Sequence, residues 1–205
     1  MNVLEASKAS GVKQFFFAST AAVYPIYSGA LNESIPTGPL DIYGLSKLAC
    51  EKICHEFFLE TNINTIVCRF FNAFGPNETN PHLIPEIQNQ VNNGLRKIKL
   101  GNLTPKRDFI HTFDMATAVE TLLNKANSGY HIYNLGRGIE YSVTEIVEAF
   151  ERLIGEKIEI EIDPAKVRKV ERQNLLADVS KLKSLGWQPQ WSIDQGVATM
   201  IEKKN

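Results

Sequence analysis

The chain has 205 residues, of which 43% are hydrophobic and 22% charged, and this balance excludes a disordered chain. Its 22 basic and 23 acidic residues leave a net charge of −1, without the strong positive field that favours nucleic acid or a membrane surface. No apolar run approaches a membrane span, and the first ten residues lack the apolar core of a signal peptide. We therefore expect a cytoplasmic globular protein whose three cysteines are reduced thiols and not metal ligands.

The first predicted strand covers residues 12–17, which are apolar, aromatic or β-branched and follow a glycine. This run predicts a strand that is buried in a sheet. Ala18, Ser19 and Thr20 come next, and small residues with hydroxyl groups are typical of the place where a chain leaves a sheet. The hydroxyl of Thr20 is therefore expected at the end of the strand.

A Pro- and Gly-rich loop, residues 25–42, separates this strand from a helix that is expected from Tyr43 to about residue 60. Tyr43 and Lys47 are four residues apart and so lie on one face of the helix. A cation beside a phenol stabilises the phenolate form. Such a pair taken alone usually indicates a solvated helix surface. Together with the Thr20 hydroxyl, however, it forms a candidate group for proton transfer.

Further along the chain, apolar runs and turn residues predict strands at 64–71, 98–101, 130–135 and 157–162, and helices at 86–93, 114–125 and 142–154. Ser142 and Glu145 have the spacing of a capping box at the start of the last helix. Asp108, His111 and Asp114 contain the residue types of a hydrolase triad, but their spacing fits internal hydrogen bonding better. The order of elements predicts an α/β fold.

The strand, the Ser-Thr at its end and the YGLSK segment together resemble the extended short-chain dehydrogenase/reductase family, the NAD-dependent nucleotide-sugar epimerases and dehydratases. Within it the UDP-glucose 4-epimerases are the most similar. RFFN at 69–72, RDFIH at 107–111 and LGW at 185–187 extend the resemblance over nearly the whole chain. It implies NAD as the cofactor, a UDP-sugar type of nucleotide sugar as the substrate, and a homodimer or other self-association.

The resemblance also implies roles for single residues. Thr20, Tyr43 and Lys47 would be catalytic, and NAD would contact Ala18, Ser19, Thr20, Tyr43, Lys47 and Phe71. The nucleotide sugar would contact Asn72, His82, Leu83, Ile98, Lys99, Leu100, Arg107, Arg168 and Glu171. Glu171 stands where the family has Asp, one methylene shorter. Asn72, read without the resemblance, would only cap a turn.

The residues after Thr20 indicate which reaction to expect within the resemblance. Dehydratases and sugar-acid decarboxylases carry acidic residues there, whereas this chain has Ala21 and Ala22. Methyl groups cannot act as acids or bases, so epimerisation at C4 through a transient 4-keto sugar is the expected reaction. It needs only the tyrosine and the hydroxyl.

The family fold implies the second half of a Rossmann-type parallel sheet with a smaller substrate-binding lobe. Residues 1–74 and 112–140 would form the partial NAD-binding domain, and residues 75–111 and 141–205 the lobe. The sequence contains no Gly-rich phosphate-binding turn between a strand and a helix. Two alternatives follow: a part of a longer enzyme, or a non-catalytic sugar-nucleotide-binding remnant or interaction module. We expect the isolated chain to bind NAD very weakly, to have no epimerase activity and to self-associate through an open strand edge or an exposed helix face.

Overall fold

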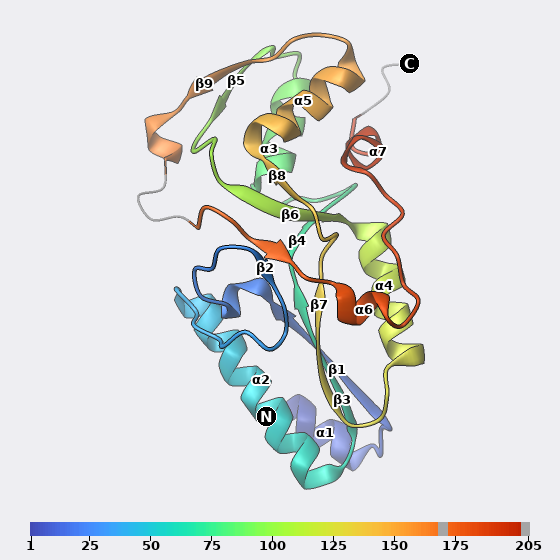
Figure 1. Cartoon of the computed structure of the whole chain (residues 1–205). Coiled ribbons are helices and arrows are strands. Elements are labelled where there is room, and N and C mark those ends of the chain that lie inside the picture. Colours follow the sequence, from blue (N-terminus) through green and yellow to red (C-terminus); the bar gives the residue numbers. More distant parts are fainter. Residues whose placement is uncertain (168–171, 202–205) are drawn as a thin grey trace.

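The computed structural model describes residues 1–167 and 172–201, and it contains a parallel sheet (Figure 1). Three strands form this sheet in the order β1 (Gln14–Thr20), β3 (Asn64–Phe70) and β7 (Tyr130–Leu135). The chain crosses from β1 to β3 through helix α2 (Ile42–Thr61), and α4 (Thr112–Lys125) precedes β7. Parallel strands joined through helices define an α/β fold, so the predicted fold class is confirmed.

Side chains of the sheet alternate between its two faces, as the pleat of a strand requires. One face is apolar and is covered by α4 and by α6 (Ser180–Lys183). The buried side chains of this layer are Ile66, Cys68, Ile110, Ala118, Leu122, Tyr133, Leu135, Leu182 and Trp187. The other face meets α2, which an ion pair between Lys8 and Glu60 links to α1 (Asn2–Ala9).

Strand β1 is less buried than its apolar sequence predicts. Within the described residues it pairs only with β3, so it is an edge strand. Its aromatic residues are half-buried, Ala18 is exposed, and only Ser19 is buried. The prediction of a buried strand was therefore wrong. An apolar run indicates side chains that are suited to burial, but it does not show whether other elements cover both sides of the strand.

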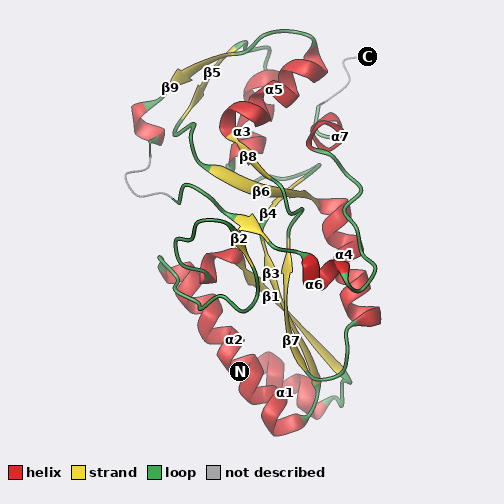
Figure 2. Cartoon of the chain, in the orientation of Figure 1, coloured by secondary structure: helices red, strands yellow, loops and turns green. Residues whose placement is uncertain are grey.

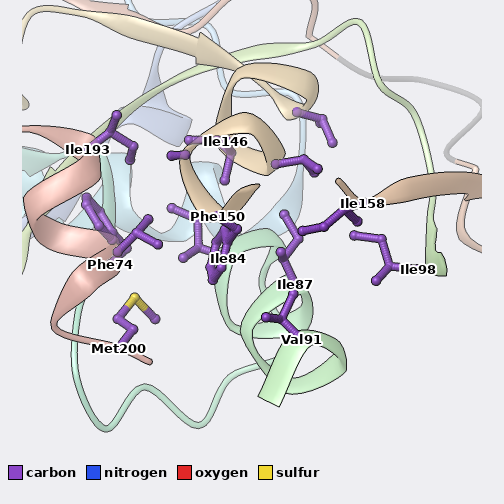
Figure 3. Packing of buried hydrophobic residues seen from close by; sticks show 14 of the residues in the cluster. Phe74, Ile84, Ile87, Val91, Ile98, Ile146, Phe150, Ile158, Ile193 and Met200 are labelled. Atoms are coloured by element: carbon purple, nitrogen blue, oxygen red, sulfur yellow. The ribbon is translucent and has the colours of Figure 1, made fainter. Parts of the chain in front are cut away.

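A second group of elements encloses an apolar core of its own, shown at the top of Figure 1 and close up in Figure 3. Helices α3 (Leu83–Asn92), α5 (Val143–Ile154) and α7 (Ile193–Ala198) pack with the parallel pair β5 (Lys97–Leu100) and β9 (Glu159–Ile162). Sixteen buried residues make this core: Phe74, Ile84, Ile87, Val91, Ile98, Leu100, Phe109, Val143, Ile146, Val147, Ala149, Phe150, Ile158, Ile193, Val197 and Met200. The predicted capping box at Ser142 and Glu145 is confirmed at the start of α5.

Short elements lie between the two cores (Figure 2). They are β4 (Asn72–Phe74), β6 (Lys106–His111) and β8 (Glu140–Ser142), which form one sheet, the pair β2 (Ala30–Leu31) and β10 (Leu176–Ala177), and the 3-10 turn η1 (Ala21–Val23). The 3-10 turn η2 (Pro164–Lys166) belongs to the lobe, where Lys166 pairs with Glu86 of α3. After β10 the chain returns to the main sheet: Leu182 of α6 and Trp187 belong to the apolar layer of that sheet. The sequence analysis had assigned residues 141–205 to the lobe. No helix in the described part of the chain is long and apolar enough to cross a membrane.

One buried carboxylate joins three of these segments. Asp108 of β6 accepts the backbone N–H groups of Arg137 at 2.7 Å, Gly138 at 2.8 Å and Ala177 at 3.2 Å. The turn after β7 approaches it so closely that a side chain at Gly136 would lie 2.7 Å from Asp108 Oδ2. Burial raises the pKa of Asp108 to about 6, while the three N–H donors oppose this rise.

This raised pKa predicts a pH dependence of folding stability. The folded state binds the Asp108 proton more tightly than the unfolded chain does, so the favourable contribution is present below about pH 4 and is lost as the pH rises through about 6. Asp108→Asn removes the ionisation. Relative to the wild type, the stability of this variant should therefore improve by up to about 3 kcal/mol between about pH 4 and pH 7 in urea unfolding.

The matched control for this prediction is Asp194→Asn, which removes an exposed carboxylate paired with Arg152. It should show no comparable pH trend, because a solvated carboxylate is screened by water. A stability gap between wild type and Asp108→Asn that stays constant over the same pH range would contradict the prediction.

Candidate active site

The candidate site lies where β1 ends and α2 begins. Asp41 caps the helix, because its Oδ1 accepts the backbone N–H of Gly44 at 2.6 Å. Tyr43 in the first turn is 56% exposed, so its phenol is open to a ligand. One turn later Lys47 donates from its Nζ to the carbonyl oxygen of Ala18 at 2.9 Å. The ammonium is thereby held at the carboxyl end of β1.

Thr20 is the last residue of β1 and the cap of the turn η1. Its Oγ1 accepts the backbone N–H of Ala22 at 3.2 Å, which leaves the hydroxyl proton available to a further acceptor. The structure therefore brings the end of β1, with Thr20, to the first two turns of α2, which carry the phenol and the ammonium. Carboxyl ends of parallel strands are where ligands bind in open α/β sheets.

Sequence reasoning missed the role of Gly44, although it lies within the YGLSK segment. A Cβ at this position would lie 2.4 Å from the carbonyl oxygen of Ala22 and 3.0 Å from Pro39 Cβ. The helix therefore approaches η1 with its bare backbone. This close approach sets how near the first turn of α2 lies to the residues that follow Thr20.

Arg172 is a second residue that sequence reasoning missed. Its guanidinium donates to three backbone carbonyls of the η1 segment, those of Ala21 at 3.4 Å, Ala22 at 3.2 Å and Tyr24 at 2.7 Å. Burial lowers the pKa of Arg172, and the negative charge of Asp41 opposes this effect. These carbonyl acceptors carry no net charge and do not neutralise the guanidinium. Arg172 therefore places a positive charge beside the site.

Two residues that were predicted to contact the cofactor have buried side chains. The hydroxyl of Ser19 donates to the carboxylate of Glu51 inside the protein. Phe71 is 6% exposed and packs in an apolar cluster with Tyr24 and Leu31. Ser19 as a whole is only 3% exposed, so both side chains are almost completely enclosed by the protein.

The predicted substrate residues of β5 divide between its two faces. Ile98 and Leu100 point into the lobe core and are 0% and 2% exposed, whereas Lys99 is exposed. A strand alternates its side chains, so a ligand beside β5 would meet Lys99 or the backbone but not the two apolar side chains.

His82 stands at the start of α3, beside the half-buried Leu83. Its Nδ1 lies 2.7 Å from Glu78 Oε1, a partner that the sequence analysis did not identify.

Asn72 and Arg107 come from the adjacent strands β4 and β6. Asn72 is the register partner of Phe109, and Arg107 lies two residues before Phe109. Arg107 is half-buried and donates to the carbonyl of Lys106 at 2.8 Å. Arg168 and Glu171 lie outside the described residues.

The expected internal role of the hydrolase-like residues is confirmed. Asp114 accepts the backbone N–H groups of Gln190 at 2.8 Å and Trp191 at 2.9 Å. His111 is buried and stacks on the ring of Trp191, with the centroids 4.5 Å apart. Burial lowers the pKa of His111. Within residues 1–167 and 172–201, no three His, Cys, Asp or Glu side chains gather to hold a metal ion.

The close contact at Gly44 yields a testable prediction. Gly44→Ala must displace η1 or the first turn of α2, because its Cβ cannot remain 2.4 Å from an oxygen atom. The better helix propensity of alanine, about 1 kcal/mol, should not offset this clash. We expect a lower melting temperature than that of the wild type in circular dichroism. Leu45→Ala is the control, since Leu45 is exposed. An equal or raised melting temperature for Gly44→Ala would count against the close packing.

Solved structures similar to this chain support the same arrangement of elements. RMD from Pseudomonas aeruginosa, complexed with NADPH, has a TM-score of 0.89 and 25% identity, and the match covers 98% of this chain and 69% of that one. UDP-glucose 4-epimerase from Bifidobacterium longum, in complex with NAD+ and UDP, has a TM-score of 0.86 and 28% identity over 97% of this chain and 65% of that one.

Sequence relatives point in the same direction. GDP-L-fucose synthase of Sinorhizobium fredii is 30% identical over 98% of this chain and 68% of its own length. UDP-glucose 4-epimerase 2 of Oryza sativa is 33% identical over 95% of this chain and 53% of its own length. The chain thus spans only part of these relatives, 65% in the case of putative GDP-L-fucose synthase 2 of Arabidopsis thaliana. Residues 1–136 match the sequence model of the NAD dependent epimerase/dehydratase family, and the chain belongs to this family.

Proposed function

We propose that the chain carries the catalytic residues of an NAD-dependent nucleotide-sugar epimerase that acts at C4 of a UDP-sugar. The observation that carries this proposal is the Lys47 ammonium held by the Ala18 carbonyl, two residues before Thr20 at the carboxyl end of β1 and one helical turn from an exposed Tyr43. Similarity to UDP-glucose 4-epimerases of Oryza sativa and Bifidobacterium longum supports it.

The residues at this end of the sheet fit the nicotinamide end of NAD. Lys47 has N–H groups beyond the one that Ala18 accepts, and Tyr43 and Ala18 are exposed. A Gly-rich turn for the pyrophosphate does not occur in this sequence. We therefore assign to this chain only the contacts near the reacting ring, from Ala18, Thr20, Tyr43 and Lys47. Bound NAD would supply the acceptor and donor of hydride.

The chain's own residues would handle the proton of the reacting hydroxyl. Tyr43 as phenolate removes the proton from the sugar 4-hydroxyl and returns it after the 4-keto sugar has turned over. Lys47 stabilises the phenolate electrostatically. Thr20 hydrogen-bonds the reacting oxygen through its free hydroxyl proton. Arg107 would hold the diphosphate, so the keto intermediate remains tethered while its other face is presented.

Reaction at C4 without loss of water fits the residues after Thr20. Ala21 and Val23 are buried and Ala22 is half-buried, and none of them can donate or accept a proton through its side chain. Epimerisation returns every atom of the sugar and needs no second acid or base. Reduction of a keto sugar needs no second acid or base either, and the similarity to GDP-L-fucose synthase makes it the second candidate.

The proposal predicts that turnover depends on the Tyr43 hydroxyl. In a longer protein that joins this chain to a Gly-rich phosphate-binding half, conversion of UDP-galactose to UDP-glucose with NAD should fall by about 100-fold or more in Tyr43→Phe, because general acid–base catalysis contributes roughly that factor. Tyr133→Phe is the control, since that ring packs under Lys181 away from the site. An unimpaired Tyr43→Phe protein would refute the assignment. Inactivity with UDP-galactose but NADPH oxidation with a GDP-4-keto sugar would favour the reductase.

A separate prediction concerns the diphosphate. Arg107→Ala should weaken UDP binding by about 1.5–3 kcal/mol in calorimetry, which is the usual worth of a charge-assisted hydrogen bond. Arg152→Ala removes an arginine of the same lobe that pairs with Asp194, and it should bind UDP like the wild type. Equal affinities for Arg107→Ala and wild type would remove Arg107 from the substrate site.

A further inference from the structure

A row of buried polar side chains crosses the main sheet beneath α2. Ser19, Arg69 and Asn134 are register partners on β1, β3 and β7, so they lie side by side on one face of the sheet. All three are at most 3% exposed. Polar groups buried in this way are retained only when their hydrogen bonds are satisfied. For Ser19 and Arg69 the partner comes from the helix above, whereas the Asn134 side chain bonds to Tyr24 and to the Leu31 carbonyl.

That partner is Glu51 of α2, which is 2% exposed. Its carboxylate accepts from Arg69 in a two-point contact, Nε to Oε1 at 3.0 Å and Nη2 to Oε2 at 2.7 Å. Oε1 also accepts the Ser19 hydroxyl, and the backbone carbonyl of Glu51 accepts the hydroxyl of Tyr130 at 3.2 Å. One helical residue is therefore bonded to all three strands of the sheet.

The far side of Arg69 is closed by an aromatic ring. Its Cζ lies 4.7 Å from the centre of the Tyr24 ring, while Nη1 has no hydrogen-bond partner within the described residues. The ring face takes the place of that partner as a cation–π contact. The Tyr24 hydroxyl then donates to Asn134 Oδ1 at 2.8 Å. Tyr24 follows η1 directly, so the same row also fixes the segment that comes after Thr20.

Glu51 shares its helix face with the two candidate catalytic residues. Tyr43, Lys47 and Glu51 are successive members of one series spaced by four residues. Lys47 lies about 6 Å from Glu51 along the helix axis, and Tyr43 about 12 Å. A rotation or slide of α2 that broke the two-point contact would therefore move the ammonium away from the Ala18 carbonyl.

We propose that Glu51, through Arg69 and Ser19, is a positioning residue that sets where Lys47 and Tyr43 lie relative to the end of β1. The inference rests on the proposed function for its catalytic meaning, but the placement itself is independent of turnover. A purely structural role would be met equally well by apolar side chains of similar volume, because replacing a buried ion pair in this way often leaves stability unchanged. The two-point contact adds a directional constraint on the rotation of the helix that apolar side chains in the same place would not supply.

The test uses nuclear magnetic resonance of the whole chain without cofactor or substrate, so its outcome does not depend on activity. The probes are the Lys47 ammonium resonance, which hydrogen bonding to Ala18 protects from exchange with water, and the Tyr43 ring resonances. Two variants are compared: Glu51→Gln, which keeps the shape but loses the charge, and the double variant Glu51→Leu/Arg69→Leu, which removes the pair altogether. Glu60→Gln on the same helix is the control, since Glu60 is exposed and pairs with Lys8.

We expect the double variant to fold with a melting temperature near that of the wild type, to lose the protected Lys47 resonance and to shift the Tyr43 ring resonances. Glu60→Gln should retain both signals. A folded double variant with unchanged Lys47 and Tyr43 resonances would overturn the proposal. Unfolding of both Glu51 variants would assign the pair to stability alone and would also overturn it. If only the turnover prediction for Tyr43 fails, the placement stands and the proposed reaction falls.

Discussion

The arrangement of the candidate site depends on one buried ion pair, Glu51 with Arg69. A carboxylate and a guanidinium are expensive to remove from water, and the cost is offset only when their geometry and their remaining hydrogen bonds are good. Here a two-point contact, the Ser19 hydroxyl and the Tyr24 ring complete the surroundings of the two charges. Although burial opposes the charged form of Arg69, its hydrogen bond to Glu51 keeps its pKa high, so the guanidinium stays charged.

A second buried charge plays a comparable role at the boundary with the lobe. Within residues 1–167 and 172–201, the Asp108 carboxylate is bonded only to three backbone N–H groups, and so it joins the turn after β7 and the strand β10 to β6. Among the described residues no cation pairs with Asp108 as directly as Arg69 pairs with Glu51, and burial raises the pKa of Asp108. The ion pair of Glu51 and Arg69 thus holds α2 on the main sheet. Asp108 holds β6 to the neighbouring segments, and its backbone hydrogen bonds offset part of the cost of its burial.

The fold was largely predictable from the sequence, and the site only in part. Long apolar runs, such as that of β3, correctly predicted strands, and the capping box at Ser142 correctly predicted the start of α5. Both signals are local in the sequence. The open strand edge that the family pattern implied is found at β1, which pairs only with β3 within the described residues. The half-buried state of its aromatic side chains was not predictable, since burial depends on which elements lie beside the strand. Neither was the return of Trp187 to the main sheet, where its Nε1 donates to Thr117 Oγ1 at 3.1 Å across a long stretch of sequence.

The sequence by itself determined the family and the types of chemical group that the site contains: a phenol and an ammonium four residues apart, a hydroxyl at a strand end, and methyl groups directly after that hydroxyl. These depend on spacing along the chain and are fixed by helix and strand periods. Only the tertiary structure decided which of the predicted residues face outward. It turned Ser19, Ile98 and Leu100 inward, and it gave Gly44 and Arg172 their contacts with η1. The reason is physical: burial and close approach are properties of segments that meet in space, and no local pattern records them.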